Sequence, residues 1–374
     1  MIREGHEICS FGNSRTFSTV TYSVSCVSYL AQAVTIYILL QIISMSFSVI
    51  KPGLLDTIQD MGRNGYGNWG INPGGSMDQY AAQVANLLVG NCTQEAVIEI
   101  HFPGPQILFE QNTLIAVTGG DFTPTVNDTI IPRWQPVVVR KNTVLHFPSL
   151  VQGSRCYISV HGGYCMEKWL GSCSTNLKAG VGGWQGRALK KGDELPFKEN
   201  TIYFAGILKE ERNFEVLPWR VNTGKVYRYP HEIGFIRGNE WDLLSAAARE
   251  NFLDNNFLIH PSSDRMGYQL KGIPLEAERP RELISSAVSF GTVQLLPNGQ
   301  LIILMADHQT TGGYPRIAHV ISAHLPKLAQ LRPCDTIQFK PMDIVAAEEI
   351  LMGQQKELHI LQRACQDHLN ELVS

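Results

Sequence analysis

The stretch Leu301-Ile-Ile-Leu-Met-Ala-Asp-His-Gln-Thr-Thr-Gly-Gly-Tyr-Pro-Arg316 joins a strongly apolar run to a polar, glycine-rich turn. A short apolar run that ends at a turn is typical of a buried β-strand, and this one delivers Asp307 to the turn. Gly312 and Gly313 leave backbone N–H groups unblocked, and Pro315 predicts that a helix begins directly afterwards. Because N–H groups at a helix start attract negative charge, the stretch predicts a site for an anion or a developing oxyanion.

Two interpretations of this turn are open. In the first, Asp307 and His308 act as acid–base groups beside the anion site. In the second, the turn is structural, and Asp307 and Thr311 only satisfy backbone donors. The first interpretation gives two sets of candidates, which are the catalytic residues Asp307, Gln309, Thr310 and Thr311 and the anion-binding residues Gly312, Gly313, Tyr314 and Arg316.

Apolar runs bounded by Gly, Pro or Asn dominate the chain from Phe47 to about Val226 and predict strands. They include Ala96–Ile100, Thr113–Val117, Val137–Val139, Val144–Phe147 and Tyr157–Val160. Amphipathic segments predict four helices. The first begins after Ser76 or Asp78 and ends at Gly90, and the second runs from Trp241 to Phe252. The third lies between Pro315 and Pro326, and the fourth extends from Asp343 to about Leu372. The chain is therefore predicted to be mainly β with flanking helices, in two halves that meet near residues 222–229.

Composition excludes several classes of function. The 374 residues carry a formal net charge of −3, so the chain offers no basic field for nucleic acid. Its 11 histidines and 8 cysteines have no metal-ligand spacing, so no metal site is predicted. The sequence G-x-x-x-x-G-K-[ST] of a phosphate-binding loop is absent. The scattered cysteines are typical of a reduced, cytoplasmic protein.

The first 44 residues differ from the rest of the chain. Residues 27–44 are mostly apolar and approach the length of a membrane span, and the 26 residues before them are rich in Ser and Thr. Three interpretations are open, namely a translation start at Met45, a membrane anchor and a signal peptide. We expect the start at Met45, because an ordinary strand and turn begin at Ser46. We expect membrane contact only if residues 1–44 are translated.

Three further clusters combine glycine with polar and charged residues, within residues 56–78, 161–187 and 261–268. They supply the candidates Arg63, Asp78 and Arg265 for substrate or anion binding and His161 for catalysis. A structural interpretation is open for each cluster. Asp60 can simply pair with Arg63, and Asp264 with Arg265. His161 can equally be a hydrogen-bonded residue at the end of a strand.

Five segments of these clusters together resemble one family, the large subunit of the biotin-dependent carboxyltransferase-like proteins. The segments are Gly53-Leu-Leu-Asp-Thr-Ile-Gln-Asp-Met-Gly-Arg63, Gly74-Gly-Ser-Met-Asp78, Leu170-Gly-Ser-Cys-Ser-Thr175, Ser263-Asp-Arg-Met-Gly267 and Asp307-His-Gln-Thr-Thr-Gly-Gly-Tyr-Pro-Arg316. The resemblance extends from about residue 46 to 340. It departs from the family pattern at Cys334, where the family typically has Gly, and in the 44-residue leader.

The resemblance implies two tandem cyclophilin-like β-barrel domains. We expect an N-terminal domain over residues 46–225, a C-terminal domain over 226–342 and a C-terminal helix over 343–374. Residues 1–44 are expected to lie outside this fold.

The family also implies a choice between functions. The first expectation is the C subunit of an ATP-dependent 5-oxoprolinase, a hydrolase that opens 5-oxoproline to L-glutamate together with its A and B subunits, with ATP bound in the complex. One alternative is allophanate hydrolase subunit 2, a carboxyltransferase acting on urea or a related small amide, and only this alternative involves biotin. The other is a non-catalytic antagonist of a kinase inhibitor. No biotin-attachment sequence occurs in the chain, which favours the first expectation.

Overall fold

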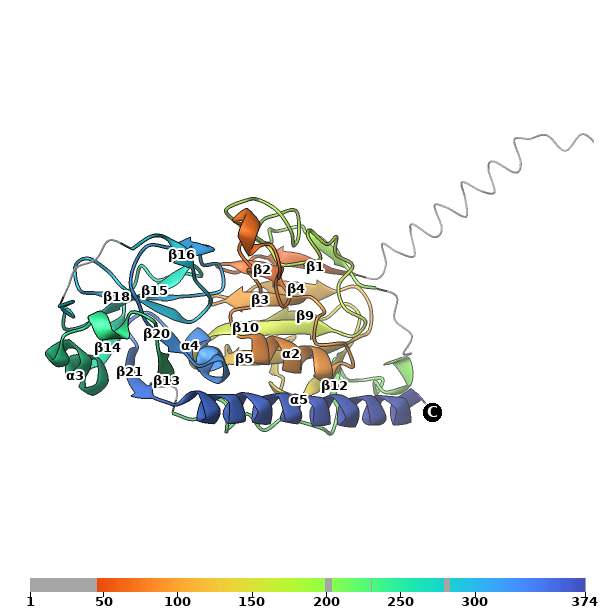
Figure 1. The fold of residues 1–374 in the computed structure, drawn as a ribbon. Helices are drawn as coiled ribbons and strands as arrows, with labels where there is room; N and C mark the ends of the chain where they lie inside the picture. Colours follow the sequence, from red (N-terminus) through yellow and green to blue (C-terminus); the bar gives the residue numbers. More distant parts are fainter. Residues whose placement is uncertain (1–45, 199–203, 230, 279–282, 374) are drawn as a thin grey trace, which may run out of the picture. The chain divides into compact units, whose positions relative to one another are not determined.

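The computed structural model describes residues 46–198, 204–229, 231–278 and 283–373, and most of its regular structure is β. Strands β1 to β12 form two six-stranded sheets (Figure 1). One has the order β11 (Glu194–Pro196), β1 (Ser46–Lys51), β4 (Gln106–Phe109), β9 (Val144–His146), β6 (Thr125–Val126) and β7 (Thr129–Ile130). The other has the order β12 (Phe214–Val216), β8 (Pro136–Val139), β5 (Thr113–Asp121), β10 (Gln152–Val160), β3 (Val97–His101) and β2 (Asp56–Gln59).

The second half of the chain forms a closed barrel of seven strands. Their order is β13 (Glu232–Arg237), β20 (Arg316–Val320), β17 (Thr292–Leu295), β18 (Leu301–Leu304), β15 (Gly267–Lys271), β14 (Asn256–Ile259) and β21 (Thr336–Pro341). A separate pair joins β16 (Ser286–Ala287) to β19 (Thr311–Gly312). The expectation of a mainly-β fold with flanking helices is confirmed, and the boundary between residues 225 and 226 stays a prediction.

The helices are few and lie beside the strands (Figure 1). They are α2 (Gln79–Leu88), α3 (Ala246–Asp254), α4 (Leu325–Ala329) and α5 (Ile344–Val373), with short 3-10 turns η1 (Gly67–Trp69), η2 (Phe204–Gly206), η3 (Trp241–Leu243) and η4 (Ser322–His324). Asp78, one of the two predicted cap residues, caps α2 through a hydrogen bond from the N–H of Ala81. The C-terminal helix α5 is also confirmed and packs against both α2 and η4.

The predicted helix after Pro315 is wrong. Residues 316–320 form β20, which pairs with β13 on one side and with β17 on the other. The apolar residues Ile317, Ala318 and Val320 thereby enter the barrel core. A barrel strand satisfies its backbone donors and acceptors on both sides, and this tertiary pairing outweighs the local preference for a helix after proline.

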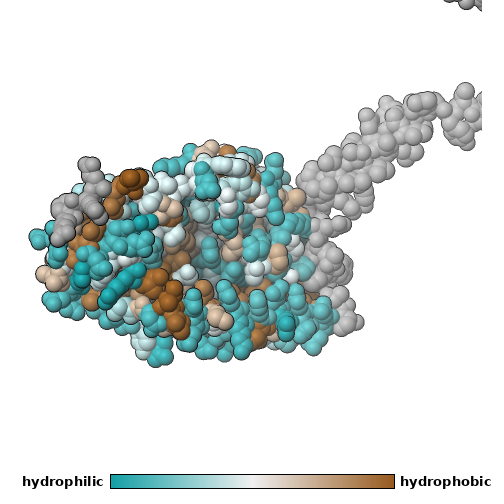
Figure 2. All heavy atoms as spheres, in the orientation of Figure 1, coloured by the Kyte–Doolittle hydropathy of each residue, from teal (hydrophilic) through white to brown (hydrophobic). Residues whose placement is uncertain are grey.

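Apolar packing divides into three clusters. One fills the barrel, a second lies between the two sheets, and the third joins α2 and α5 to the face of the β5–β10 sheet. In Figure 2 apolar residues also gather at the surface over α4. Within the described ranges no helix is long and apolar enough to cross a membrane. The expected leader, residues 1–44, lies outside the described residues.

Candidate functional site

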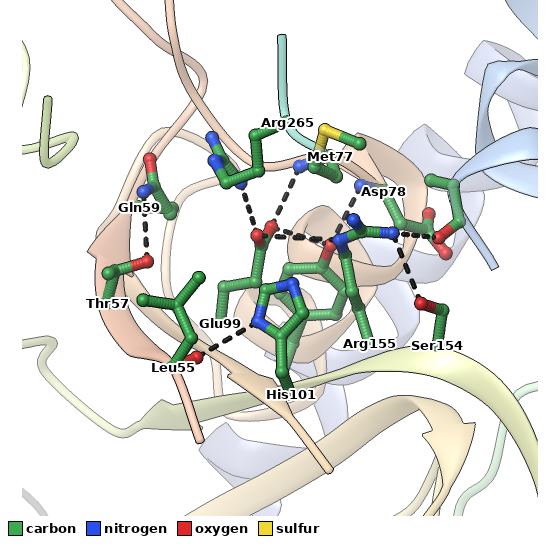
Figure 3. Close-up of polar contacts among 12 residues, drawn as sticks. Leu55, Thr57, Gln59, Met77, Asp78, Glu99, His101, Ser154, Arg155 and Arg265 are labelled. Carbon is green, nitrogen blue, oxygen red and sulfur yellow. Dashed lines mark hydrogen bonds and ion pairs between the residues drawn. The ribbon is translucent and has the colours of Figure 1, made fainter. Parts of the chain in front are cut away.

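A fully buried carboxylate, Glu99, stands at the centre of a polar cluster where the sheets meet the barrel half (Figure 3). Its Oε2 accepts hydrogen bonds from the N–H of Met77 and the hydroxyl of Tyr157, each at 2.8 Å. Its Oε1 accepts a hydrogen bond from Nη1 of Arg265 and lies 3.8 Å from Nε of Arg155. Burial opposes the charge on Glu99, but the two guanidinium groups prevail and hold its pKa below the ordinary value.

Arg265 connects the barrel half to the segment that precedes α2. Its Nε donates to Oδ2 of Asp307 at 2.8 Å, and its Nη2 donates to Oδ1 of Asp307 at 3.1 Å and to the carbonyl of Gly75 at 2.6 Å. The guanidinium therefore contacts both Glu99 and Asp307, and these carboxylates raise the pKa of Arg265 in spite of its burial. The expected turn pair of Asp264 with Arg265 is not what forms, because Asp264 instead accepts the N–H groups of Met266 and Gly267.

The second buried arginine, Arg155, ties the β5–β10 sheet to the barrel half. Its Nη1 donates to the hydroxyl of Tyr268 at 2.8 Å and to the carbonyl of Ala329 at 2.6 Å. Gln330 completes this junction, because its Oε1 accepts the N–H of Arg155 at 3.2 Å and its Nε2 donates to Asp78 at 2.7 Å. The junction between the halves is therefore built from buried, paired polar groups.

Asp60 organises a loop from a distant part of the chain. Its carboxylate accepts the hydroxyls of Ser172 and Ser174 at 2.7 and 2.6 Å, and the N–H of Cys173 at 2.6 Å. The interpretation that Asp60 simply pairs with Arg63 is wrong, since these serines and the loop backbone occupy the carboxylate. The first and third family segments are thus joined by hydrogen bonds.

Arg63 lies beside this loop with part of its guanidinium unpaired. Nη2 donates to the carbonyl of Ser174, and the guanidinium carbon lies 4.9 Å from the ring centre of Trp169. Among the described residues, the buried Nε and Nη1 have no hydrogen-bond partner. Burial lowers the pKa of Arg63, although the charges of Asp60 and Asp307 act in the opposite direction.

Gly74 separates Arg63 from Asp307. Its φ is +62°, a conformation that favours glycine. A Cβ at this position would lie 3.1 Å from Nη1 of Arg63 and 3.6 Å from Oδ1 of Asp307. The open N–H of the arginine and the carboxylate of the ion pair therefore flank the same glycine.

A pocket of about 790 Å³ adjoins this glycine. It lies between the first half, the barrel half and α5, and its wall includes Met61, Asn64, Gly74, Tyr80, Phe290, His308, Leu351, Gln354 and Leu358. His308 is 3% exposed, and its Nδ1 bonds to the carbonyl of Gln309 at 2.6 Å, so Nδ1 carries the proton and Nε2 is left as an acceptor. Burial lowers the pKa of His308, which favours the neutral imidazole.

Asp78 plays a structural part beside the cluster. One of its oxygens caps α2, and the other accepts the hydroxyl of Tyr227 at 2.8 Å and the amide of Gln330 at 2.7 Å. Its side chain is fully buried, and burial raises its pKa to about 6. No group of three His, Cys, Asp or Glu side chains that could hold a metal occurs in the described part of the chain.

The structure brings together Arg63, Asp78, Arg265 and Asp307 of the predicted site residues, and it places the others elsewhere. His161 bonds to the carbonyl of Val89 and packs edge-on against Phe204. Thr311 and Gly312 form β19, with Gln309 and Thr310 just before it. Gly313 and Tyr314 line a different pocket of about 730 Å³.

The expected oxyanion site at a helix start after Gly313 is therefore wrong, because β20 begins there instead. Arg316 is not free to act as its cation. Its backbone N–H, Nε and Nη2 all donate to Glu240, at 2.9, 3.0 and 2.7 Å. This pairing and the partial burial of both side chains anchor β20 to the segment that precedes η3.

Sequence reasoning missed Glu99, Arg155 and Tyr157. Glu99 interrupts the apolar run Ala96–Ile100 that had been predicted as a strand. A carboxylate inside a buried strand needs a partner, so this interruption was a usable signal. Arg155 precedes a predicted strand and gave no comparable signal.

Comparisons with known proteins place these segments in a wider context. Residues 69–341 match the family described as "Carboxyltransferase domain, subdomain A and B". The C subunit of the 5-oxoprolinase of Haemophilus influenzae is 35% identical over 294 residues, which cover 79% of this chain and 90% of that protein. The C subunit of the Escherichia coli 5-oxoprolinase is 34% identical over 313 residues, covering 82% and 95%.

A solved structure, the urea carboxylase of Kluyveromyces lactis, has a similar fold with a TM-score of 0.75 and 30% identity. The match covers 85% of this chain but 29% of the urea carboxylase chain. The chain thus spans nearly the whole of two relatives and under a third of the third protein.

Proposed function

This chain belongs to the family of carboxyltransferase domains with subdomains A and B, and on that premise we propose that it is the C subunit of an ATP-dependent 5-oxoprolinase. In this proposal it opens 5-oxoproline to L-glutamate together with partner A and B subunits. The observation that supports it is coverage, since the match spans 90% and 95% of two proteins named as the C subunit of 5-oxoprolinase. The same chain spans 29% of the urea carboxylase structure.

The reaction sets three demands on this site. The ring amide of 5-oxoproline is stable, and ATP in the complex supplies the activation of its carbonyl. Attack on that carbonyl places negative charge on oxygen, which a fixed donor must meet. The substrate also carries a carboxylate, which needs a cation.

Arg63 meets the last of these demands in the proposal, and His308 supplies a base for the attacking water. The buried Nε and Nη1 of Arg63 are unpaired donors in a rigid fork, and we assign them to the substrate carboxylate. The neutral His308 presents Nε2 as a proton acceptor in the wall of the 790 Å³ pocket, where it can activate water.

Asp307 has a different role in this scheme. The two-point pair with Arg265 stabilises its charged form, so Asp307 is a fixed negative group rather than a proton acceptor. We assign it to holding Arg265 and the Gly74 segment in place beside Arg63. It is then a positioning residue, whose loss acts through its neighbours.

The test is reconstitution. The chain is co-purified from its native host with any partner subunits, and glutamate formation from 5-oxoproline is measured with and without ATP. ATP-dependent glutamate formation that needs this chain supports the proposal. A complex of the A and B subunits that forms glutamate equally well without this chain contradicts it.

The second candidate function is transfer of a carboxyl group from biotin to urea or a related amide. The 30% identity and TM-score of 0.75 to the urea carboxylase favour it. Biotin supplies the carboxyl group in that reaction, and Arg63 would then face the transferring carboxylate. Labelled bicarbonate incorporated into a urea product, with a biotin carboxylase present, would support this alternative against the first.

A further inference from the structure

A third pocket, of about 490 Å³, lies beside the junction of Arg155 and Gln330 and carries several cationic groups. One wall is the irregular pairing of β5 with β10, at Gly119, Gly120 and Gly153. The opposite wall is the end of α4 and the loop after it, with Lys327, Gln330 and Arg332. None of these residues was predicted as part of a site from the sequence.

Lys327 is the decisive residue of this pocket. It is 7% exposed and lines the pocket, yet its ammonium group has no hydrogen bond or ion pair with any described residue. The stem of Lys327 is thus largely buried, while its ammonium group has no acceptor among the described residues in the pocket that it lines. Burial lowers the pKa of Lys327, and Glu232 opposes this effect from outside the pocket wall.

The other charges around Lys327 leave an excess of positive charge. The guanidinium of Arg332 also has no hydrogen bond or ion pair with a described residue. Arg133 is neutralised, since it donates to Asp121 at 3.0 Å and to the carbonyl of Gly119 at 2.9 Å. Asp335 uses one carboxylate oxygen to accept the backbone N–H of Arg332 at 2.8 Å.

The remaining groups do not supply a counter-ion inside the pocket. Nδ1 of His231 bonds to the carbonyl of Thr336 at 2.7 Å. Gln330 is uncharged, and its Oε1 accepts the N–H groups of Ser154 and Arg155 while its Nε2 donates to Asp78. Lys327 and Arg332 therefore face the pocket as two cations against the partly occupied carboxylate of Asp335.

Glycine keeps the strand wall of the pocket, formed by β5 and β10, close to Gln330. Gly153 has a φ of +84°, and a Cβ there would lie 2.6 Å from the Cα of Gly120 and 2.8 Å from Oε1 of Gln330. A side chain at this position would push the strand wall away from Gln330. The wall is thus held in one geometry by contacts that only glycine permits.

We propose that this pocket binds a small oxyanion, of the phosphate or carboxylate class, between Lys327 and Arg332. An oxyanion supplies the acceptors that the ammonium and the guanidinium lack, and charge-assisted hydrogen bonds of this kind are the strong ones. A phosphate and an amino-acid carboxylate share this chemistry, so the experiment separates them by its probes. The proposal does not depend on the reaction assigned to the Glu99 cluster.

The test is isothermal titration of the full chain in low-chloride buffer with three probes, namely pyrophosphate, inorganic phosphate and L-glutamate. We expect saturable, one-to-one binding of at least one probe, and the probe that binds identifies the source. Lys327→Met should weaken that binding at least tenfold, and Arg332→Gln several-fold. The exposed Lys271→Met is the matched control and should bind as the wild type does.

Thermal unfolding with and without the probe distinguishes a loss of binding from a loss of folding. Lys327→Met should be as stable as the wild type or more stable without the probe, because it removes an unpaired charge from a largely buried side chain. It should gain no stability from the probe that stabilises the wild type. The proposal is overturned if none of the three probes binds the wild type, or if Lys327→Met and Arg332→Gln both bind as tightly as Lys271→Met.

Discussion

Arg265 and Asp307 form a two-point ion pair, in which Nε lies 2.8 Å from Oδ2 and Nη2 lies 3.1 Å from Oδ1. The antiparallel pairing of β15 with β18 explains their meeting, since Arg265 precedes the first strand and Asp307 follows the second. The N–H of Asp307 also donates to the carbonyl of Arg265 at 2.8 Å. Two family segments far apart in the sequence are thus held together by both backbone and side chains.

Asp307→Asn should lower ATP-dependent turnover of the reconstituted enzyme by about a hundredfold or more, as loss of a preorganised charge typically does. The amide cannot keep both bonds to the Arg265 fork, so the Gly74 segment beside Arg63 loses its support. Thr311→Val is the matched control, since Thr311 is exposed in β19. Near-full turnover of Asp307→Asn in a normally assembled complex would contradict the role given to this pair.

Arg63→Lys should raise the KM for 5-oxoproline by about ten- to a hundredfold with a smaller effect on kcat. Lysine keeps the charge but loses the fork that presents Nε and Nη1 together. Steady-state kinetics over a range of 5-oxoproline concentrations separates the two constants. A fall in kcat with an unchanged KM would move Arg63 from substrate binding to the chemical step.

Glu99→Gln should lower the free energy of unfolding by about 3–5 kcal/mol, because Arg155 stays buried without a carboxylate and Arg265 keeps only Asp307. Urea unfolding followed by tryptophan fluorescence measures the change. Glu215→Gln is the control, since its pair with Arg212 at 3.1 Å is partly exposed and should cost less than about 1 kcal/mol. Equal losses in the two variants would show that the buried pairs contribute no more than a surface pair does.

Asp56 should make stability depend on pH. Burial raises its folded-state pKa to about 7, above the ordinary value near 4. Between these values the folded protein holds a proton that the unfolded chain releases. The stability that Asp56 contributes is therefore complete at low pH and is lost as pH rises toward and through 7.

The measurement is urea unfolding of Asp56→Asn and wild type between pH 4.5 and 8. The free energy of unfolding of the wild type should fall relative to that of the variant as pH rises, by about 1.4 kcal/mol for each pH unit between the two pKa values. The exposed Asp254→Asn shows what loss of a surface carboxylate does over the same range. Parallel curves for Asp56→Asn and wild type would rule out the raised pKa.

If the chain has the B subunit that the proposed function requires, Met352→Glu should weaken that complex without destabilising the chain. Val345, Met352 and Ile360 are 59, 67 and 60% exposed on one side of α5, and an apolar surface of this kind favours burial by a partner. Pull-down of the B subunit should fall at least tenfold. Gln366→Glu adds the same charge at an exposed polar position of α5, and equal losses in both variants would exclude a specific apolar contact.

The sequence predicted most strands and the two best-defined helices, because alternation, caps and glycine are local signals. The start of α2 is an example, since the apolar stripe predicts a cap at Ser76 or Asp78 and the structure has it at Asp78. The segment after Pro315 shows the limit of such signals. Its strand depends on β13 and β17, and neither neighbour can be inferred from the residues around Pro315.

The candidate site was predictable only as a set of segments. Arg63, Arg265 and Asp307 were named because they belong to family motifs, but their geometry follows from strand order and loop packing. Glu99 and Arg265 are 166 positions apart, and no local pattern pairs them. The segment from Gln309 to Arg316 is equally polar, yet Thr311 and Gly312 pair in β19 and Arg316 pairs with Glu240.

Glu99 limits how this protein can be recombined. Its carboxylate belongs to the first half of the chain, and one of its counter-ions, Arg265, belongs to the second. Their side chains are 0% and 8% exposed. A chimera that takes one half from a relative must keep both a carboxylate at position 99 and a cation at position 265, or one of the two charges is buried without its partner. Exchange of halves between relatives is thus expected to succeed only when both members of this pair are preserved together.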